Sequence, residues 1–270
     1  MIILDKTRNA GDMDQTIQVR IHGDKTVPTL IYLPGLHGNW TLVGSFRQAL
    51  AGRVRFVEMT YPPTLTWSLV DYAHSVESIL ANHGITHGWL LAESFSSQVV
   101  WAMLARARFK AEGLILAGGF VRHPAQWGAR LAERVAADIP FALLTSILFG
   151  YAKVARIRFR HSPETIAGIQ EFIARLTEEE RRAARHRLHL VAQNDPREIA
   201  RQALVPVYAL TGVLDPVVLW PWVRSWLKKN CPALKDYRIF WWADHNVLGT
   251  APQAAADQVV RWVTNERKMP

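Results

Sequence analysis

The chain contains a serine, a histidine and an aspartate whose positions suit nucleophilic catalysis: Ser94, His245 and Asp215. A serine hydroxyl is a poor nucleophile until a base removes its proton, and a histidine that acts as this base needs an acid to orient it. The chemistry of such a set is acyl transfer through a covalent intermediate. We expect Ser94 to be the nucleophile, His245 the base and Asp215 the orienting acid.

Ser94 lies within residues 90–98, LLAESFSSQ, where an apolar strand runs directly into a helix. A turn of this kind is tight and strained, so the residues two before and two after the serine must be small, and here they are Ala92 and Ser96. The hydroxyl then lies at a helix N-terminus, which favours developing negative charge. On local sequence alone, the alternative is that Ser94 only caps this helix.

Asp215 and His245 each follow a predicted strand. Asp215 comes after the strand at 207–210 and directly before a proline, where aspartate is often only a turn residue. His245 comes after the strand at 237–241 and is one of 10 histidines. Each signal alone is weak. Because the C-terminal ends of parallel strands meet at one edge of a sheet, Ser94, Asp215 and His245 can converge there, and their joint occurrence is far more specific.

A glycine-bearing turn follows an early strand at residues 33–38, LPGLHG. Such a turn can aim a backbone N–H at a reacting oxygen, a contribution commonly worth several kcal/mol. We predict that the N–H groups of Leu36 and Phe95 form an oxyanion hole. The alternative is an ordinary Pro-Gly turn.

The elements that must position these residues alternate between strands and helices. The strands expected at 89–92 and 113–117 are apolar throughout, as in a parallel sheet that helices cover on both faces. The pattern also predicts strands at 16–23, 29–33, 54–59, 207–210 and 237–241, and helices at 68–82, 96–108, 220–229 and 251–267. The fold class is therefore α/β, with a mostly parallel central sheet flanked by helices.

The alternation stops between residues 120 and 203, a stretch that is mostly helical in pattern and rich in arginine. We expect a core domain formed by 1–119 and 204–270, and a helical cap inserted at 120–203. The cap contains an apolar run at 139–151, which either lines an acyl-binding pocket or packs the cap onto the core.

The chain resembles the α/β-hydrolase superfamily along nearly its whole length outside the insertion. The resemblance rests on Pro34-Gly35 at the oxyanion turn, on residues 92–96 at the nucleophile elbow, on Asp215 three residues after a glycine, and on His245 before the last helix. It implies the α/β-hydrolase fold, the triad and the absence of a cofactor. We also expect no metal, because no histidine, aspartate and glutamate cluster in the sequence has ligand spacing.

The sequence departs from the family pattern at four positions. Ala92 and Ser96 replace the usual glycines of the elbow, and Ser96 is the departure that bears most on turnover. Pro34 stands where histidine is common, and Asp244 replaces the glycine that often precedes the base. Asp244 is a rival acid, but a residue adjacent to His245 on an extended backbone points away from it.

The composition bears on the role of the cysteine and on the location of the protein. The 270 residues include a single cysteine, Cys231, for which we expect a structural role because it lies between a helix end and a turn. The N-terminal residues turn polar after the fourth, unlike those of a secretory signal, and the longest apolar run has 13 residues, short of a membrane span. We therefore expect a cytoplasmic protein without a membrane span.

The net charge of +9 accompanies no nucleic-acid motif, so we expect no nucleic-acid partner. Between Arg122 and Arg201 there are 14 basic and 9 acidic residues, a balance of +5. This segment either attracts an anionic substrate, such as an acyl group on a phosphorylated carrier, or simply presents solvated helix surfaces. Residues 177–182 (TEEERR) favour the second view, since they have the pattern of a helix start.

The leading functional hypothesis is hydrolysis of a small-molecule carboxylic ester or thioester with an apolar acyl part. The same scaffold also supports carbon–carbon bond hydrolysis and lyase chemistry, because the triad does not encode the substrate. A third possibility, from a different class, is a non-catalytic hydrolase-like binding protein. An epoxide hydrolase or haloalkane dehalogenase is disfavoured, because those relatives have aspartate at the elbow.

Overall fold

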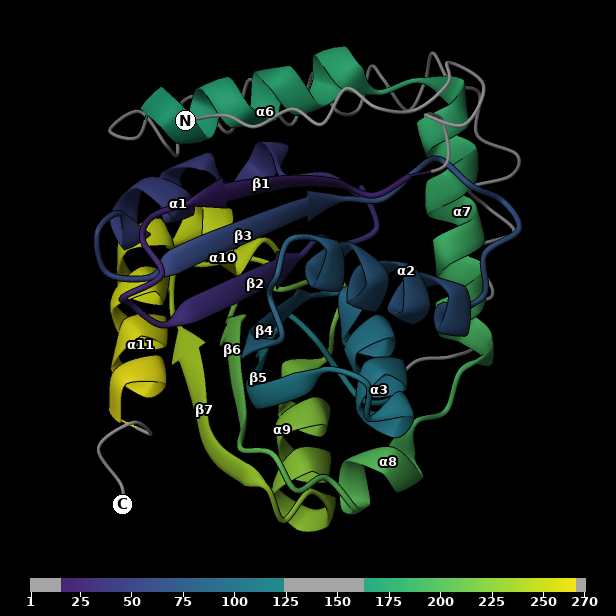
Figure 1. The fold of residues 1–270 in the computed structure, drawn as a ribbon, viewed down its shortest axis with the longest axis vertical. Coiled ribbons are helices and arrows are strands. Elements are labelled where there is room, and N and C mark those ends of the chain that lie inside the picture. Colours follow the sequence, from purple (N-terminus) through teal and green to yellow (C-terminus); the bar gives the residue numbers. More distant parts are fainter. Residues whose placement is uncertain (1–15, 124–162, 266–270) are drawn as a thin grey trace.

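In the computed structural model of this chain, the described residues are 16–123 and 163–265. They contain a seven-stranded sheet with the order β1-β3-β2-β4-β5-β6-β7 (Figure 1). The strands are β1 (Gln18–His22), β2 (Thr29–Leu33), β3 (Arg55–Thr60), β4 (His87–Glu93), β5 (Lys110–Ala117), β6 (Val207–Gly212) and β7 (Leu234–Phe240). Only β1 is antiparallel to its neighbour, which confirms the predicted mostly parallel sheet.

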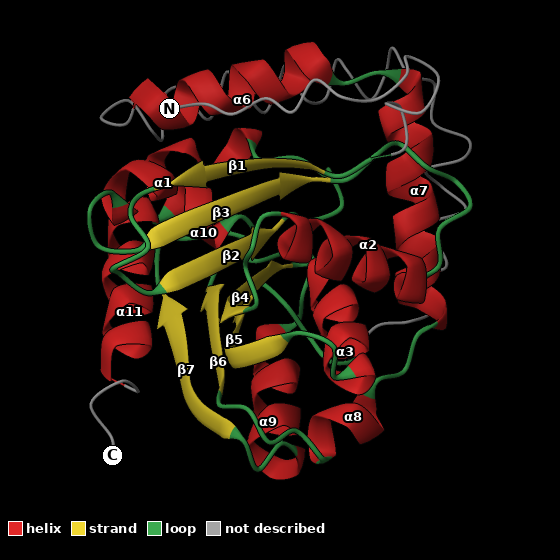
Figure 2. Ribbon diagram, viewed as in Figure 1, coloured by secondary structure: helices red, strands yellow, loops and turns green. Residues whose placement is uncertain are grey.

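Helices cover both faces of the sheet (Figure 2). One layer contains α1 (Gly44–Leu50), α10 (Val247–Thr250) and α11 (Pro252–Asn265), and the other contains α2 (Leu69–Asn82), α3 (Ser96–Arg106), α8 (Arg197–Arg201) and α9 (Trp220–Asn230). Successive residues of β2 pack alternately against the two helix layers. Ile31 packs with α2 and α3, and Leu30 packs with α1 and α11. This two-sided burial explains why the central strands are apolar throughout.

The start of α2 shows how local sequence determines an element. Ser68 accepts a hydrogen bond from the backbone N–H of Asp71, and the Asp71 carboxylate accepts one from the backbone N–H of Ser68. This capping box satisfies two helix N–H groups that would otherwise lack partners. The helix predicted at 68–82 is therefore confirmed, and Ser68 is its N-cap.

The insertion between β5 and β6 contains α6 (Pro163–Arg175), α7 (Glu178–Gln193) and α8. The hydroxyl of Thr177 accepts a hydrogen bond of 3.2 Å from the backbone N–H of Glu180, so α7 starts where the sequence predicted. Figure 1 shows α6 across one end of the molecule and α7 beside α2. Within the described ranges, we find no helix that is both long and apolar enough to span a membrane.

The differences from prediction concern short elements and element ends. Helix α1, helix α10 and a 3-10 turn at Thr41–Val43 were not predicted, because they are too short to show a helical period. Helix α3 ends at Arg106 rather than 108, because Ala107 adopts a left-handed conformation with φ of 50°.

Candidate active site

The backbone at Ser94 turns sharply between β4 and α3. Ser94 has a φ of 46°, a left-handed conformation that is strained for a residue with a side chain. The surrounding structure holds this conformation, since the backbone N–H of Ser94 donates to the carbonyl of Ala117 at 3.0 Å. No side chain caps α3, so Ser94 does not act as the helix cap that its local sequence also allowed.

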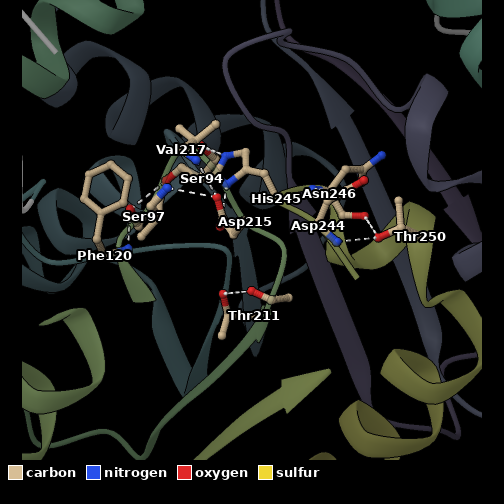
Figure 3. A network of polar contacts seen from close by, with 12 residues as sticks. Ser94, Ser97, Phe120, Thr211, Asp215, Val217, Asp244, His245, Asn246 and Thr250 are labelled. Carbon is tan, nitrogen blue, oxygen red and sulfur yellow. Dashed lines mark hydrogen bonds and ion pairs between the residues drawn. The ribbon is translucent and has the colours of Figure 1, made fainter. Parts of the chain in front are cut away.

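Ser94, His245 and Asp215 lie together at the C-terminal edge of the sheet (Figure 3). The Oγ of Ser94 is 2.8 Å from Nε2 of His245, and Nδ1 of His245 is 2.9 Å from Oδ2 of Asp215. The second carboxylate oxygen of Asp215 accepts from the backbone N–H groups of Val217 and Val218 at 2.8 and 2.9 Å. The carboxylate is thus fixed on both oxygens, and the structure brings together all three residues that the sequence singled out.

The electrostatics of this cluster favour a basic His245. Burial lowers the pKa of His245, but the hydrogen bond and negative charge of Asp215 outweigh it, and the charges of Glu93 and Asp244 add to them. The net result is a pKa above the usual value for histidine. The carboxylate of the rival acid Asp244 accepts a hydrogen bond from the backbone N–H of Asn246 at 3.0 Å, whereas Asp215 is the carboxylate bonded to Nδ1 of His245.

The two backbone N–H groups proposed for the oxyanion hole come from the turn after β2 and from the residue after Ser94. Leu36 is in the turn at residues 34–38, which is closed by a 3.0 Å hydrogen bond from the N–H of Gly38 to the carbonyl of Gly35. Phe95 directly follows Ser94. Among the described residues, neither the N–H of Leu36 nor that of Phe95 has a protein acceptor. Both groups are therefore free to bind an oxygen of a substrate.

Sequence reasoning missed a buried polar group beside Ser94. Glu93 is 4% exposed, and Oε2 of its carboxylate accepts a short hydrogen bond from the hydroxyl of Tyr32. Nε2 of His37 lies 3.9 Å from the same oxygen and is buried without a hydrogen-bond partner in the described part of the chain. Burial lowers the pKa of His37, which favours its neutral form. The signal that was available is the position of Glu93 next to the nucleophile.

A cavity of about 320 Å³ opens beside Ser94 and His245. Its apolar wall is formed by Leu36, Leu42, Phe172, Leu176, Ala184 and Val217. Helices α6 and α7 of the insertion therefore contribute to this wall. The run at 139–151, predicted either to line a pocket or to pack the cap, lies outside the described residues.

Two other groups of residues lie away from this chemistry. Cys231 is buried at the end of α9, where burial raises the pKa of its thiol. Trp222, Trp241 and Trp242 are exposed and do not line the cavity. Within residues 16–123 and 163–265, we find no cluster of histidine, cysteine, aspartate and glutamate suited to a metal ion.

Comparisons with known proteins give matches at the level of structure. No protein-family model matches the chain, and no curated protein matches its sequence. A thermophilic esterase from Thermogutta terrifontis is 18% identical, with 93% of each chain covered and a TM-score of 0.74. A carboxylesterase structure from Nitrososphaera gargenis is 15% identical, with 93% of this chain and 95% of that chain covered and a TM-score of 0.76.

An enol-lactonase from Burkholderia xenovorans LB400 is 16% identical, with 92% of this chain and 96% of that chain covered and a TM-score of 0.72. The similarity thus extends over nearly the full length of chains that share few identical residues with this one. Together with the sheet order and the turn at Ser94, it shows that the chain has the fold of the α/β-hydrolase superfamily.

Proposed function

We propose that the protein is a serine hydrolase that cleaves a carboxylic ester or thioester through Ser94. The observation that carries the proposal is the hydrogen-bonded series from Ser94 through His245 to Asp215, with contacts of 2.8 and 2.9 Å. A nucleophile within hydrogen-bond reach of a base, which is itself oriented by an acid, is the arrangement that activates a serine hydroxyl.

In the proposed reaction, the Oγ of Ser94 attacks the carbonyl carbon while Nε2 of His245 takes the hydroxyl proton. The imidazolium then protonates the leaving alcohol or thiol as the carbon–oxygen or carbon–sulfur bond breaks. A water molecule attacks the acyl-enzyme, His245 again takes a proton, and the carboxylic acid leaves with Ser94 restored. Asp215 holds the imidazole in the tautomer that presents Nε2 to Ser94, and it stabilises the imidazolium.

The negative oxygen of the tetrahedral intermediate would accept hydrogen bonds from the N–H groups of Leu36 and Phe95. Donors that are already in place stabilise this charge without reorganisation, which makes them a large part of catalysis in acyl transfer. Support comes from the absence of acceptors for these two groups in the described part of the chain.

The cavity supports a small substrate with an apolar acyl part. Its volume of about 320 Å³ lies near the lower end of the roughly 300–1,000 Å³ found for small-molecule sites. The structural neighbours support the reaction class, since they include an esterase, a carboxylesterase and an enol-lactonase. We further propose that residues 120–203 form the cap domain over a core of 1–119 and 204–270.

The experiment that tests this function is a panel of p-nitrophenyl esters and matching thioesters of increasing acyl length, assayed on wild type, Ser94→Ala and Asp215→Asn. We expect turnover by wild type and a loss of kcat/KM on the order of 10⁴-fold or more in both variants. Binding of the esters without turnover would favour a binding protein. Turnover only of substrates with an activated carbon–carbon bond would favour the hydrolase or lyase alternative.

A further inference from the structure

Arg187 of the inserted helix α7 is fully buried, with a relative exposure of 0%. Its side chain extends from the insertion, and its guanidinium contacts residues of the core. Nη1 donates to the carbonyl of Leu36 at 2.8 Å and Nη2 to the carbonyl of Pro62 at 3.0 Å. Nε donates to the hydroxyl of Tyr72 at 3.4 Å, consistent with α7 lying beside α2 in Figure 1.

The charge of Arg187 lacks the partner that buried cations normally have. No carboxylate of the described residues lies within ion-pair distance of it. Carbonyl and hydroxyl dipoles and the ring of Tyr61, at 5.8 Å, surround the charge, and the half-buried carboxylate of Glu180 interacts with it without a direct bond. Burying a charge in this way is unfavourable compared with burying an apolar side chain of similar size. The guanidinium is therefore better explained by what it binds than by packing.

What Arg187 binds is the residue whose N–H we assign to the oxyanion hole. Three carbonyls of the turn at 34–38 accept hydrogen bonds from residues outside the turn. Ser96 donates to the carbonyl of Pro34 at 2.5 Å, Arg187 donates to that of Leu36, and the N–H of Tyr61 donates to that of Gly38 at 2.7 Å. Leu36 also lines the cavity, so these bonds fix the turn at the edge of the site.

Gly38 shows how closely the guanidinium fits the turn. It has a φ of 72°, and a Cβ at this position would lie 2.5 Å from Nη1 of Arg187. Only glycine satisfies both the backbone conformation and the space that Arg187 occupies. The effect of the cation also reaches the cavity wall, because its charge adds to burial in lowering the pKa of His37.

We propose that Arg187 is a positioning residue: by binding the carbonyl of Leu36 and packing against Gly38, it holds the turn at 34–38 in the conformation that points the N–H of Leu36, in the preceding peptide group, at the oxygen of the tetrahedral intermediate. The insertion then completes the oxyanion hole in addition to covering the cavity. This inference rests on the proposed function, because a hole for an oxyanion has meaning only if acyl transfer occurs.

The test compares wild type with Arg187→Lys and with Arg187→Gln. The lysine keeps the charge but lacks the two Nη groups that donate to separate carbonyls. Arg182→Lys, an exposed position on the same helix, is the matched control. Active sites are titrated with a fluorophosphonate, and kcat, KM and inhibition by an alkyl trifluoromethyl ketone are measured on a short ester. This ketone adds to serine and places an oxyanion in the hole.

We expect kcat per active site to fall about 10- to 100-fold in the Arg187 variants, since misplacing a donor costs less than removing it. KM should change little, and the ketone should bind more weakly in proportion to the loss of kcat/KM. The control should behave as wild type. A purely structural Arg187 would instead lower the melting temperature and the number of active sites, and leave kcat and ketone affinity per site unchanged.

If the Arg187 variants do not fold, kcat and ketone affinity are measured on Tyr72→Phe, which removes one hydrogen-bond partner of the guanidinium and keeps the aromatic ring. A smaller loss of kcat with matching loss of ketone affinity supports the inference, and unchanged values overturn it. A wild type that takes up no fluorophosphonate overturns the proposed function and this inference with it. A labelled wild type beside variants with unchanged kcat overturns the inference alone.

Discussion

The hydroxyl of Ser96 donates a hydrogen bond of 2.5 Å to the carbonyl of Pro34, and so connects the turn at Ser94 with the turn that contains Leu36. Because a hydroxyl has one proton, the 2.7 Å contact between Ser96 and Tyr61 must be donated by the phenol. Ser96 replaces the glycine that is usual in the family. In this chain, the replacement links the nucleophile to one side of the proposed oxyanion hole.

We therefore predict that Ser96→Ala lowers both stability and activity. The carbonyl of Pro34 and the hydroxyl of Tyr61 would lose a buried partner, at a cost of about 1–3 kcal/mol in the free energy of unfolding. Displacement of the turn should lower kcat by up to about 10²-fold. Urea unfolding and ester kinetics measure both effects.

Ser68→Ala is the control for Ser96→Ala, since loss of the α2 cap costs about 1 kcal/mol far from the site. It should lower stability and leave kcat unchanged. Equal losses of kcat in the two variants would show that the effect of Ser96 is only one of stability.

The pH dependence of activity should report the raised pKa of His245. His245 acts as a base in its neutral form, so kcat/KM should fall as the pH drops through a value above the usual histidine pKa of about 6.5. Below that value the imidazolium cannot accept the proton of Ser94. A pH–rate profile whose acidic limb lies well below 6.5 would contradict this picture.

Glu93→Gln should move this acidic limb to lower pH. The negative charge of Glu93 contributes to the raised pKa of His245, so its removal makes the imidazolium easier to deprotonate. The profile of kcat/KM against pH measures the shift. Glu112→Gln, at a carboxylate that pairs with His87, is the control and should leave the limb in place.

Gly118→Ala should disturb His245 specifically. Gly118 has a φ of 55°, and a Cβ there would lie 2.8 Å from the carbonyl oxygen of His245. Gly52 has a φ of 73° with open space around it, so Gly52→Ala is a matched control. Both variants should lose about 1–2 kcal/mol of stability from backbone strain. Only Gly118→Ala should also lose activity per folded molecule, and equal kcat values would contradict the expectation.

Ala184→Phe should shorten the preferred acyl chain, because Ala184 lines the cavity from α7. The larger side chain reduces the space beside Ser94, so kcat/KM should fall for long esters and persist for acetyl esters. Ala174→Phe, at an exposed position of α6, should keep the wild-type preference. An unchanged profile in Ala184→Phe would mean that the acyl group binds elsewhere.

Much of the fold was accessible from the sequence because its signals are local. The apolar run of β4, the small residues around Ser94 and the capping box at Ser68 each act over a few residues. The convergence of Ser94, Asp215 and His245 followed from one rule, that parallel strands end at a common edge.

The remainder depended on contacts between distant residues. Arg187 bonds to a carbonyl 151 positions away, and no local pattern identifies such a partner. The sequence did hold a partial indication that Arg187 is buried, because it lies four residues from both Ala183 and Val191 on one face of α7. Sequence reasoning had treated the basic residues of this segment as solvated or as attracting an anionic substrate.

The measurement that tests the central claim most directly is labelling with a fluorophosphonate, read by intact mass, on wild type and Ser94→Ala. An activated Ser94 predicts a single adduct on wild type and none on the variant. An adduct that persists on Ser94→Ala, or a folded wild type that takes up none, would contradict the assignment of Ser94 as the nucleophile.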